Sequence, residues 1–168
     1  MTKSKTDPSS QQNQSLPLTS NGLLMVGPTP DGFEAQLAAD VMADVCQDKQ
    51  RTPAMIFVAR DDKHMNSIQQ SLRFFMGETP VLTFPAWDCL PYDRVSPQKE
   101  LVGQRLTTLA QLARVDFSAL KNPGLIVLTS INALLQRTVP KSAIADASFE
   151  ASIGDDLDQD KFSRFLTS

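Results

Sequence analysis

Short apolar runs alternate with amphipathic stretches along most of the chain. Four of these runs have the length of a buried strand, and they lie at residues 22–27, 54–59, 80–84 and 124–129. Near-continuous apolar strands separated by helices are typical of a parallel sheet that helices cover on both faces. The pattern therefore predicts an α/β fold, a three-layer domain with a mostly parallel sheet, over residues 21–140.

The stretches between the first runs have the periodicity of helices. The first predicted helix follows the run at 22–27, and its apolar face is formed by Phe33, Leu37, Val41 and Val45. The second helix begins at a capping aspartate, Asp61 or Asp62. Its apolar face is formed by Met65, Ile68, Leu72 and Phe75. Both apolar faces are expected to pack against the sheet.

Two further helices are predicted in the second half of this domain. Ser96 is expected to cap the third helix with Pro97 at the first helical position, where the missing N–H of proline does no harm. The apolar positions of this helix are Leu101, Leu106, Leu109 and Leu112. A fourth helix is predicted to follow the run at 124–129 through Leu135 and to end before Pro140.

The two ends of the chain differ in composition from the middle. Residues 1–20 are polar and of low complexity, which predicts a disordered leader. The first 140 residues contain equal numbers of acidic and basic side chains, so the net charge of −3 lies after Pro140. A neutral core lacks the basic surface of proteins that bind nucleic acid by themselves. This change of composition near Pro140 indicates a domain boundary there.

Composition also argues against several classes of protein. No apolar run reaches the roughly 18 residues of a membrane-spanning helix, and the polar N-terminus has no secretory signal, so a cytoplasmic location is expected. Cys46 and Cys89 lie far apart, and His64 is the single histidine. We therefore expect neither a disulfide framework nor a metal site. His64 is expected to be a solvent-exposed residue of a first helical turn.

The turn after the first run has the spacing of a phosphate-binding loop without its chemistry. Four residues separate Gly27 from Gly32, as in the loop that surrounds nucleotide phosphates. The next two positions should be lysine and a hydroxyl residue, but they are Phe33 and Glu34. A carboxylate here competes with a bound anion for the helix dipole. We interpret this degenerate loop as a connecting turn that binds no cofactor, with nucleotide binding as the alternative.

A proline-rich segment over residues 84–97 holds the single tryptophan and the single tyrosine of the chain. Its carboxylates, Asp88 and Asp93, would suit a general acid–base pair, but no nucleophile or metal ligand lies beside them in the sequence. The other interpretation is a rigid loop whose aromatic side chains, Trp87 and Tyr92, pack on the sheet. The second interpretation is favoured.

Three separated motifs resemble the family of bacterial transcription-repair coupling factors (Mfd). They are Phe-Pro-Ala-Trp-Asp-x-Leu-Pro-Tyr-Asp-x-x-Ser-Pro at 84–97, Arg-Leu-x-x-Leu at 105–109, and Leu-Thr-x-x-Asn-Ala-Leu-Leu-Gln-Arg at 128–137. The site residues within these motifs are Trp87, Asp88, Pro91, Tyr92, Asp93, Arg105, Asn132, Gln136 and Arg137. Either arginine, Arg105 or Arg137, is expected to pair with Asp88 or Asp93 and hold the loop. The tail over 148–166 resembles the start of that family's second subdomain, which implies that residues 141–168 are the incomplete start of an α+β, UvrA-binding subdomain.

The resemblance implies a UvrB-like N-terminal module, a helicase-like α/β lobe with an inserted second subdomain. In UvrB the first loop carries a working phosphate-binding motif, whereas in the coupling factors it is degenerate, as Phe33 and Glu34 make it here. The module is implied to be non-catalytic and to recruit UvrA in transcription-coupled nucleotide excision repair of DNA damage. The full family protein is an ATP-dependent DNA translocase that displaces stalled RNA polymerase, through downstream domains expected to be absent from this chain.

The resemblance also implies that the chain is a truncated part of its module. In the family, the region that contacts UvrA follows the point at which this chain stops, so we assign no UvrA-binding residues. Two alternatives to the interaction module stay open. One is a nucleotide-dependent α/β enzyme, and the other is a helicase-like lobe that binds DNA.

Overall fold

The computed structural model describes residues 25–30, 32–48, 52–89, 94, 96–121, 123–149, 151, 153–154 and 156–167. The strands are β1 (Ala54–Ala59), β2 (Val81–Phe84) and β3 (Leu125–Ser130). The helices are α1 (Phe33–Gln47), α2 (Asp62–Phe75), α3 (Lys99–Arg114), α4 (Ile131–Leu134), α5 (Lys141–Asp146) and α6 (Gln159–Thr167). Among the described residues, none of these helices is both long enough and apolar enough to cross a membrane. The predicted leader lies outside the described residues.

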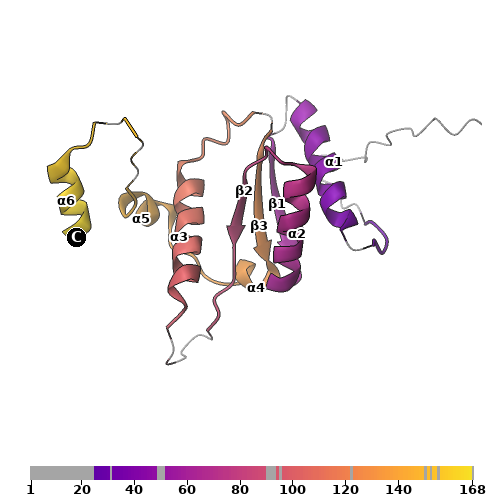
Figure 1. The fold of residues 1–168 in the computed structure, drawn as a ribbon, viewed down its shortest axis with the longest axis horizontal. Helices are drawn as coiled ribbons and strands as arrows, with labels where there is room; N and C mark the ends of the chain where they lie inside the picture. The colour runs from indigo at the N-terminus through magenta and orange to yellow at the C-terminus, as the bar shows by residue number, and fades with distance from the viewer. Residues whose placement is uncertain are drawn as a thin grey trace, which may run out of the picture.

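The three strands form one parallel sheet in the order β1-β3-β2 (Figure 1). Strand β3 pairs with β1 from Ala54 opposite Leu125 onward, and with β2 from Val81 opposite Ile126 onward. Strand β1 has the predicted bounds, and the bounds of the other two differ from the prediction by one residue. The α/β class and the parallel sheet are confirmed, because continuous apolar runs bury best in the middle of such a fold.

One face of the sheet packs against α1 and α2, and the main core lies between them. Its buried members are Ala35, Ala38, Met42, Ala59, Met65, Ile68, Leu72, Ile126 and Leu128. The predicted face of α2 is confirmed except for its last residue, Phe75, which is exposed. The predicted face of α1 is wrong, because small side chains at Ala35 and Ala38 let this helix approach its neighbours closely, while Phe33 is exposed.

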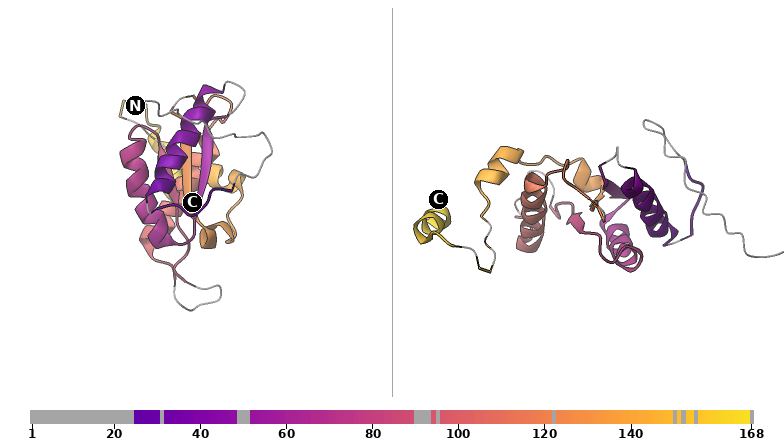
Figure 2. Two further views of the ribbon diagram at one scale, coloured as in Figure 1. Left: turned by 90° about the vertical axis from the view of Figure 1, so that its right-hand side faces the viewer. Right: turned by 90° about the horizontal axis from the view of Figure 1, so that it is seen from above.

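The second face of the sheet is covered only in part. Helix α3 lies against β2, where the Thr108 hydroxyl donates to the Thr83 carbonyl oxygen at 2.6 Å. On this face β1 presents Ile56, which is 67% exposed, and the exposed Val58. Figure 2 shows α3 on the far side of the sheet from α1, next to β2. The predicted three layers are therefore incomplete, because α3 is held at β2 and does not reach across to β1.

Two predictions at the ends of elements are wrong. Residues 25–27 form no strand, and Met25 is exposed, because this part of the apolar run has no neighbouring strand to pair with. Helix α3 begins at Lys99 with Gln98 as its cap, and not at Ser96 and Pro97. The Gln98 N–H donates to Asp88 Oδ1 at 3.3 Å, which places the start of the helix by a contact across the loop.

The segment after Pro140 makes two separate sets of contacts. Helix α5 packs against α3, and Ile144 is buried there. At the C-terminal end of α3, Arg114 Nη2 donates to the Ser148 hydroxyl at 3.0 Å. The Phe149 ring centroid lies 5.1 Å from that of Phe162 and 5.5 Å from that of Phe165 in α6. The apolar face of α6 thus packs on the ring of Phe149.

Candidate functional site

The carboxyl ends of all three strands lie at one edge of the sheet, where open α/β folds bind ligands (Figure 1). Strand β1 leads to Asp61, whose carboxylate caps α2 by accepting the His64 N–H at 2.7 Å. Strand β3 leads directly to Ser130, whose hydroxyl caps α4. Strand β2 leads into the proline-rich segment. Two of the strands are thus followed by short polar side chains that cap the next helix. We call the proline-rich segment over residues 84–97, which continues from the end of β2, the motif loop.

The degenerate loop places a carboxylate at the start of α1. Gly32 has a φ of 87°, a left-handed conformation that favours glycine, and the Phe33 N–H donates to the Pro30 carbonyl oxygen at 3.1 Å. Glu34 Oε2 lies 2.8 Å from His64 Nε2 and so links α1 to α2. The prediction of a solvent-exposed His64 is wrong, because its side chain is only 18% exposed beside Glu34.

This geometry predicts that the chain does not bind Mg-ATP. The ring of Phe33 stands where a lysine would neutralise phosphate, and the carboxylate of Glu34 stands where a hydroxyl would ligate Mg²⁺. Isothermal titration should detect no saturable binding up to about 1 mM nucleotide. Micromolar binding that ADP displaces would contradict this expectation and favour the nucleotide-dependent enzyme.

The motif loop is held by an aromatic clasp, which we define as Phe84, Trp87, Arg105 and Gln136. The guanidinium carbon of Arg105 lies 4.0 Å from the Phe84 ring centroid and 4.3 Å from that of Trp87. Arg105 Nη1 donates to the Pro85 carbonyl oxygen at 2.5 Å and to Gln136 Oε1 at 3.1 Å. The same Gln136 oxygen accepts the Trp87 N–H at 3.0 Å. The clasp therefore joins the end of β2, helix α3 and the residues after α4.

Arg105 is a buried cation, because only 2% of its surface is exposed. Desolvation lowers the pKa of its guanidinium, which stays protonated at neutral pH. Within the described part of the chain its hydrogen-bond acceptors are two neutral oxygens, and the faces of two rings supply the remaining stabilisation. Among the residues that the structure describes, the charge is thus compensated by dipoles and ring faces.

The structure brings together three of the predicted motif residues, Trp87, Arg105 and Gln136. It does not pair Arg105 with Asp88, because Asp88 instead accepts the Gln98 N–H and Arg105 lies between two rings. Asn132 and Arg137 are exposed at and just after α4. Three predicted site residues lie outside the described residues, and these are Pro91, Tyr92 and Asp93.

The sequence does not predict the central role that Gln136 and Phe84 have in the clasp. A glutamine after a short helix has no periodic signal, and its role depends on one oxygen that accepts two donors from elements distant in sequence. Phe84 was predicted only as the end of a strand. Both residues lie within the family motifs, Phe84 in the first and Gln136 in the third. These motifs are the signal in the sequence by which the two residues can be found.

The contacts of the clasp hold the loop in position. Within the described residues, no group of three histidine, cysteine or carboxylate side chains could hold a metal ion. The clasp offers a cation, an amide and two rings, which are suited to hold backbone groups in place. The general acid–base interpretation of the loop therefore gains no support from Asp88, whose carboxylate oxygen caps the start of α3.

Comparison with curated proteins identifies the relatives of this chain. It is 30% identical over 118 residues to a transcription-repair-coupling factor of Myxococcus xanthus, a match that spans 67% of the chain and 9% of the relative. It is 28% identical over 130 residues to that of Mycobacterium tuberculosis, which spans 77% of the chain and 10% of the relative. The Escherichia coli protein is 23% identical over 158 residues, which spans 94% of the chain and 12% of that relative. The chain is a homologue of the transcription-repair coupling factors.

The chain spans only about a tenth of the length of these coupling factors. No protein-family model matches the chain, and no solved structure matches it. The relationship to the coupling factors therefore rests on sequence, and the α/β fold rests on the structure itself. The resemblance that the three motifs indicated is confirmed.

Proposed function

We propose that the chain is the UvrB-like N-terminal module of a transcription-repair coupling factor and that it acts as a non-catalytic interaction module. The observation that carries this proposal is the similarity to coupling factors over most of the chain, together with the phosphate-loop position that Phe33 and Glu34 occupy. The lobe has a parallel sheet, but Phe33 replaces the lysine and Glu34 replaces the hydroxyl of a phosphate-binding loop. Such a lobe is suited to protein contact rather than to hydrolysis.

The proposed partner is UvrA, which the module would recruit in the cytoplasm to DNA damage during transcription-coupled nucleotide excision repair. Contacts with RNA polymerase and ATP-driven translocation on DNA are assigned to other parts of the much longer coupling factors. The family resemblance places the main contact with UvrA further along the family's sequence, so it assigns none of the residues of this chain to UvrA. Within this chain, we propose that the residues after Pro140 contribute to the contact through the cluster of Phe149, Phe162 and Phe165.

Biolayer interferometry with the immobilised chain and purified UvrA tests the proposal. We expect saturable binding with a dissociation constant of about 10–100 μM, because this segment supplies only part of the contact. The double variant Phe162→Ser/Phe165→Ser should weaken binding at least about tenfold, because it removes the apolar face of α6 from Phe149.

The matched control is Phe74→Ser, which removes an exposed phenylalanine far along the chain in α2. It should bind UvrA as the parent chain does. An absence of UvrA binding at about 100 μM would overturn the proposal, and so would equal binding by the α6 double variant.

A further inference from the structure

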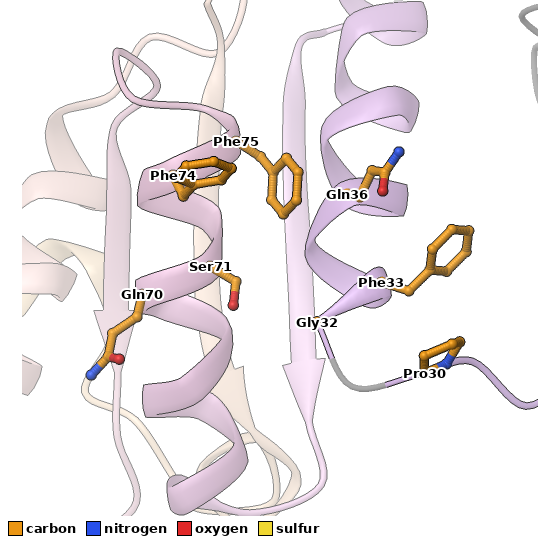
Figure 3. Close-up of a pocket in the computed structure, with 8 residues that line it drawn as sticks. All are labelled: Pro30, Gly32, Phe33, Gln36, Gln70, Ser71, Phe74 and Phe75. Carbon is orange, nitrogen blue, oxygen red and sulfur yellow. The ribbon is translucent and has the colours of Figure 1, made fainter.

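An aromatic groove lies on the outer surface of α1 and α2 (Figure 3). It has a volume of about 550 Å³, and its lining residues include Phe33 from α1 and Phe74 and Phe75 from α2. The other lining residues are Pro30, Gly32, Gln36, Gln70 and Ser71. Figure 3 shows the two neighbouring rings near the C-terminal end of α2 and Phe33 at the first turn of α1.

The three phenylalanines are not needed for the core of the domain. Helix α2 buries Met65, Ile68 and Leu72 against the sheet, whereas Phe74 is 83% exposed and Phe75 is 44% exposed. Their rings meet edge to face, with centroids 5.1 Å apart. A cluster of large apolar side chains kept in water at one place is typical of a surface that binds another molecule.

The groove is formed in advance by contacts between the two helices. The buried side chains Ala35, Ala38 and Met42 of α1 share one core with those of α2. At the N-terminal end of both helices, Glu34 Oε2 lies 2.8 Å from His64 Nε2. Because the shared core and the contact between Glu34 and His64 both fix the spacing of α1 and α2, a ligand would not need to create the groove on binding.

The charge beside the groove is negative on α1. This helix contains three carboxylates and no basic side chain. Asp40 follows Phe33 by seven residues and Asp44 follows Asp40 by four, so both lie on the same stripe of the helix as Phe33. On α2, Lys63 lies about two turns before Gln70, and Arg73 points about 100° away from Phe74 around the helix. The surface of α1 next to the Phe33 ring therefore favours a positively charged partner.

We propose that the aromatic groove binds a basic amphipathic helix of another protein. Apolar side chains at spacings of three, four and seven residues would contact Phe33, Phe74 and Phe75, while lysine or arginine side chains would lie beside Asp40 and Asp44. A groove between two helices suits a third helix, because its ridges fit between theirs. This surface is separate from the clasp and from α6, so the inference goes beyond UvrA recruitment.

Fluorescence anisotropy with a labelled helical peptide of about 15 leucine and lysine residues tests the proposal on the whole chain. The expected dissociation constant is about 10–100 μM, and a leucine–glutamate peptide of the same pattern should not bind. The double variant Phe74→Ser/Phe75→Ser should weaken binding at least about tenfold. The variant Asp40→Asn/Asp44→Asn should weaken it about two- to fivefold and reduce its dependence on salt.

Phe117→Ser is the matched control, because Phe117 is also an exposed phenylalanine, at 43%, and lies outside the groove. It should bind the peptide as the parent chain does, and all variants should keep the parent melting temperature within about 3 °C. The proposal is overturned if the leucine–glutamate peptide binds equally well or if Phe117→Ser weakens binding as much. Sedimentation that depends on concentration in the parent, but not in the groove variant, would instead assign the groove to a second copy of the chain.

Discussion

Replacement of Arg105 by alanine is expected to lower the free energy of unfolding by about 3–4 kcal/mol. The change leaves the Pro85 carbonyl oxygen without its donor, opens a cavity between Phe84 and Trp87, and removes the hydrogen bond from Arg105 to Gln136. In a chain of this size the melting temperature should fall by about 6–16 °C. Circular dichroism during thermal and urea unfolding measures both quantities.

Arg137→Ala is the control, because Arg137 is exposed, and its melting temperature should stay within about 2 °C of the parent. Arg105→Met keeps the bulk of the stem without the charge, so it should recover about half of the loss. Arg105→Lys should not restore the parent stability, because one ammonium group cannot lie flat on two rings and also reach both oxygens.

A double-mutant cycle separates the clasp from general packing. Trp87→Ala alone should cost about 2–3 kcal/mol, less than for a fully buried tryptophan, because the Trp87 side chain is only half-buried. With Arg105→Ala the two changes should be coupled by about 1 kcal/mol, since the two side chains are in direct contact. Additive effects would show that the ring and the cation act independently and would contradict the clasp.

Gly124→Ala is expected to destabilise the protein by about 2–4 kcal/mol. Gly124 has a φ of 81°, and a Cβ there would lie 2.5 Å from the Pro53 carbonyl oxygen and 3.2 Å from Met42 Sδ. The same carbonyl oxygen accepts the Leu125 N–H at 2.9 Å, so the clash would disturb the point at which β3 begins to pair with β1. Urea unfolding monitored by circular dichroism measures the loss.

Gly103→Ala is the matched control for this change. Gly103 lies within α3, and a Cβ there would meet nothing within 4 Å. Alanine favours a helix over glycine, so this variant should be more stable than the parent by about 0.5–1 kcal/mol. A loss below about 1 kcal/mol in Gly124→Ala would show that the connection at Pro53 can shift to admit a side chain.

The strands and the second helix could be predicted from sequence for a simple physical reason. The run at 54–59 is apolar throughout and ends at charged residues, so its burial requires no knowledge of its neighbours. Asp61 was a correct candidate for the cap of α2, because a short acidic side chain can accept the backbone N–H two or three residues later without any tertiary contact.

The faces of α1 and α3 could not be predicted in this way. In α1 the large residue Phe33 was expected in the core, but the small side chains of Ala35 and Ala38 occupy it. In α3 the buried positions are Arg105 and Thr108, whereas Leu106 is exposed. Burial of a cation and a hydroxyl is favourable only because partners on β2 and after α4 compensate them, and helical periodicity contains no information about such partners.

Two properties of the candidate site follow from the order of its residues along the chain alone. Phe33 and Glu34 follow the glycine loop, which removes the chemistry of phosphate binding wherever the loop lies. The string from Phe84 to Pro97 carries the family resemblance that the curated relatives confirm. Both are properties of neighbouring residues along the chain, so they hold without any knowledge of the fold.

The contacts that the motif residues make depend on the folded arrangement of distant elements. It placed Arg105 between two rings, gave Gln136 two donors from distant elements, and turned Glu34 toward His64. It also left Phe74 in solvent beside a groove. Contacts of this kind join residues from about 20 to about 50 positions apart, and their energy depends on distances of a few ångströms that no local pattern encodes.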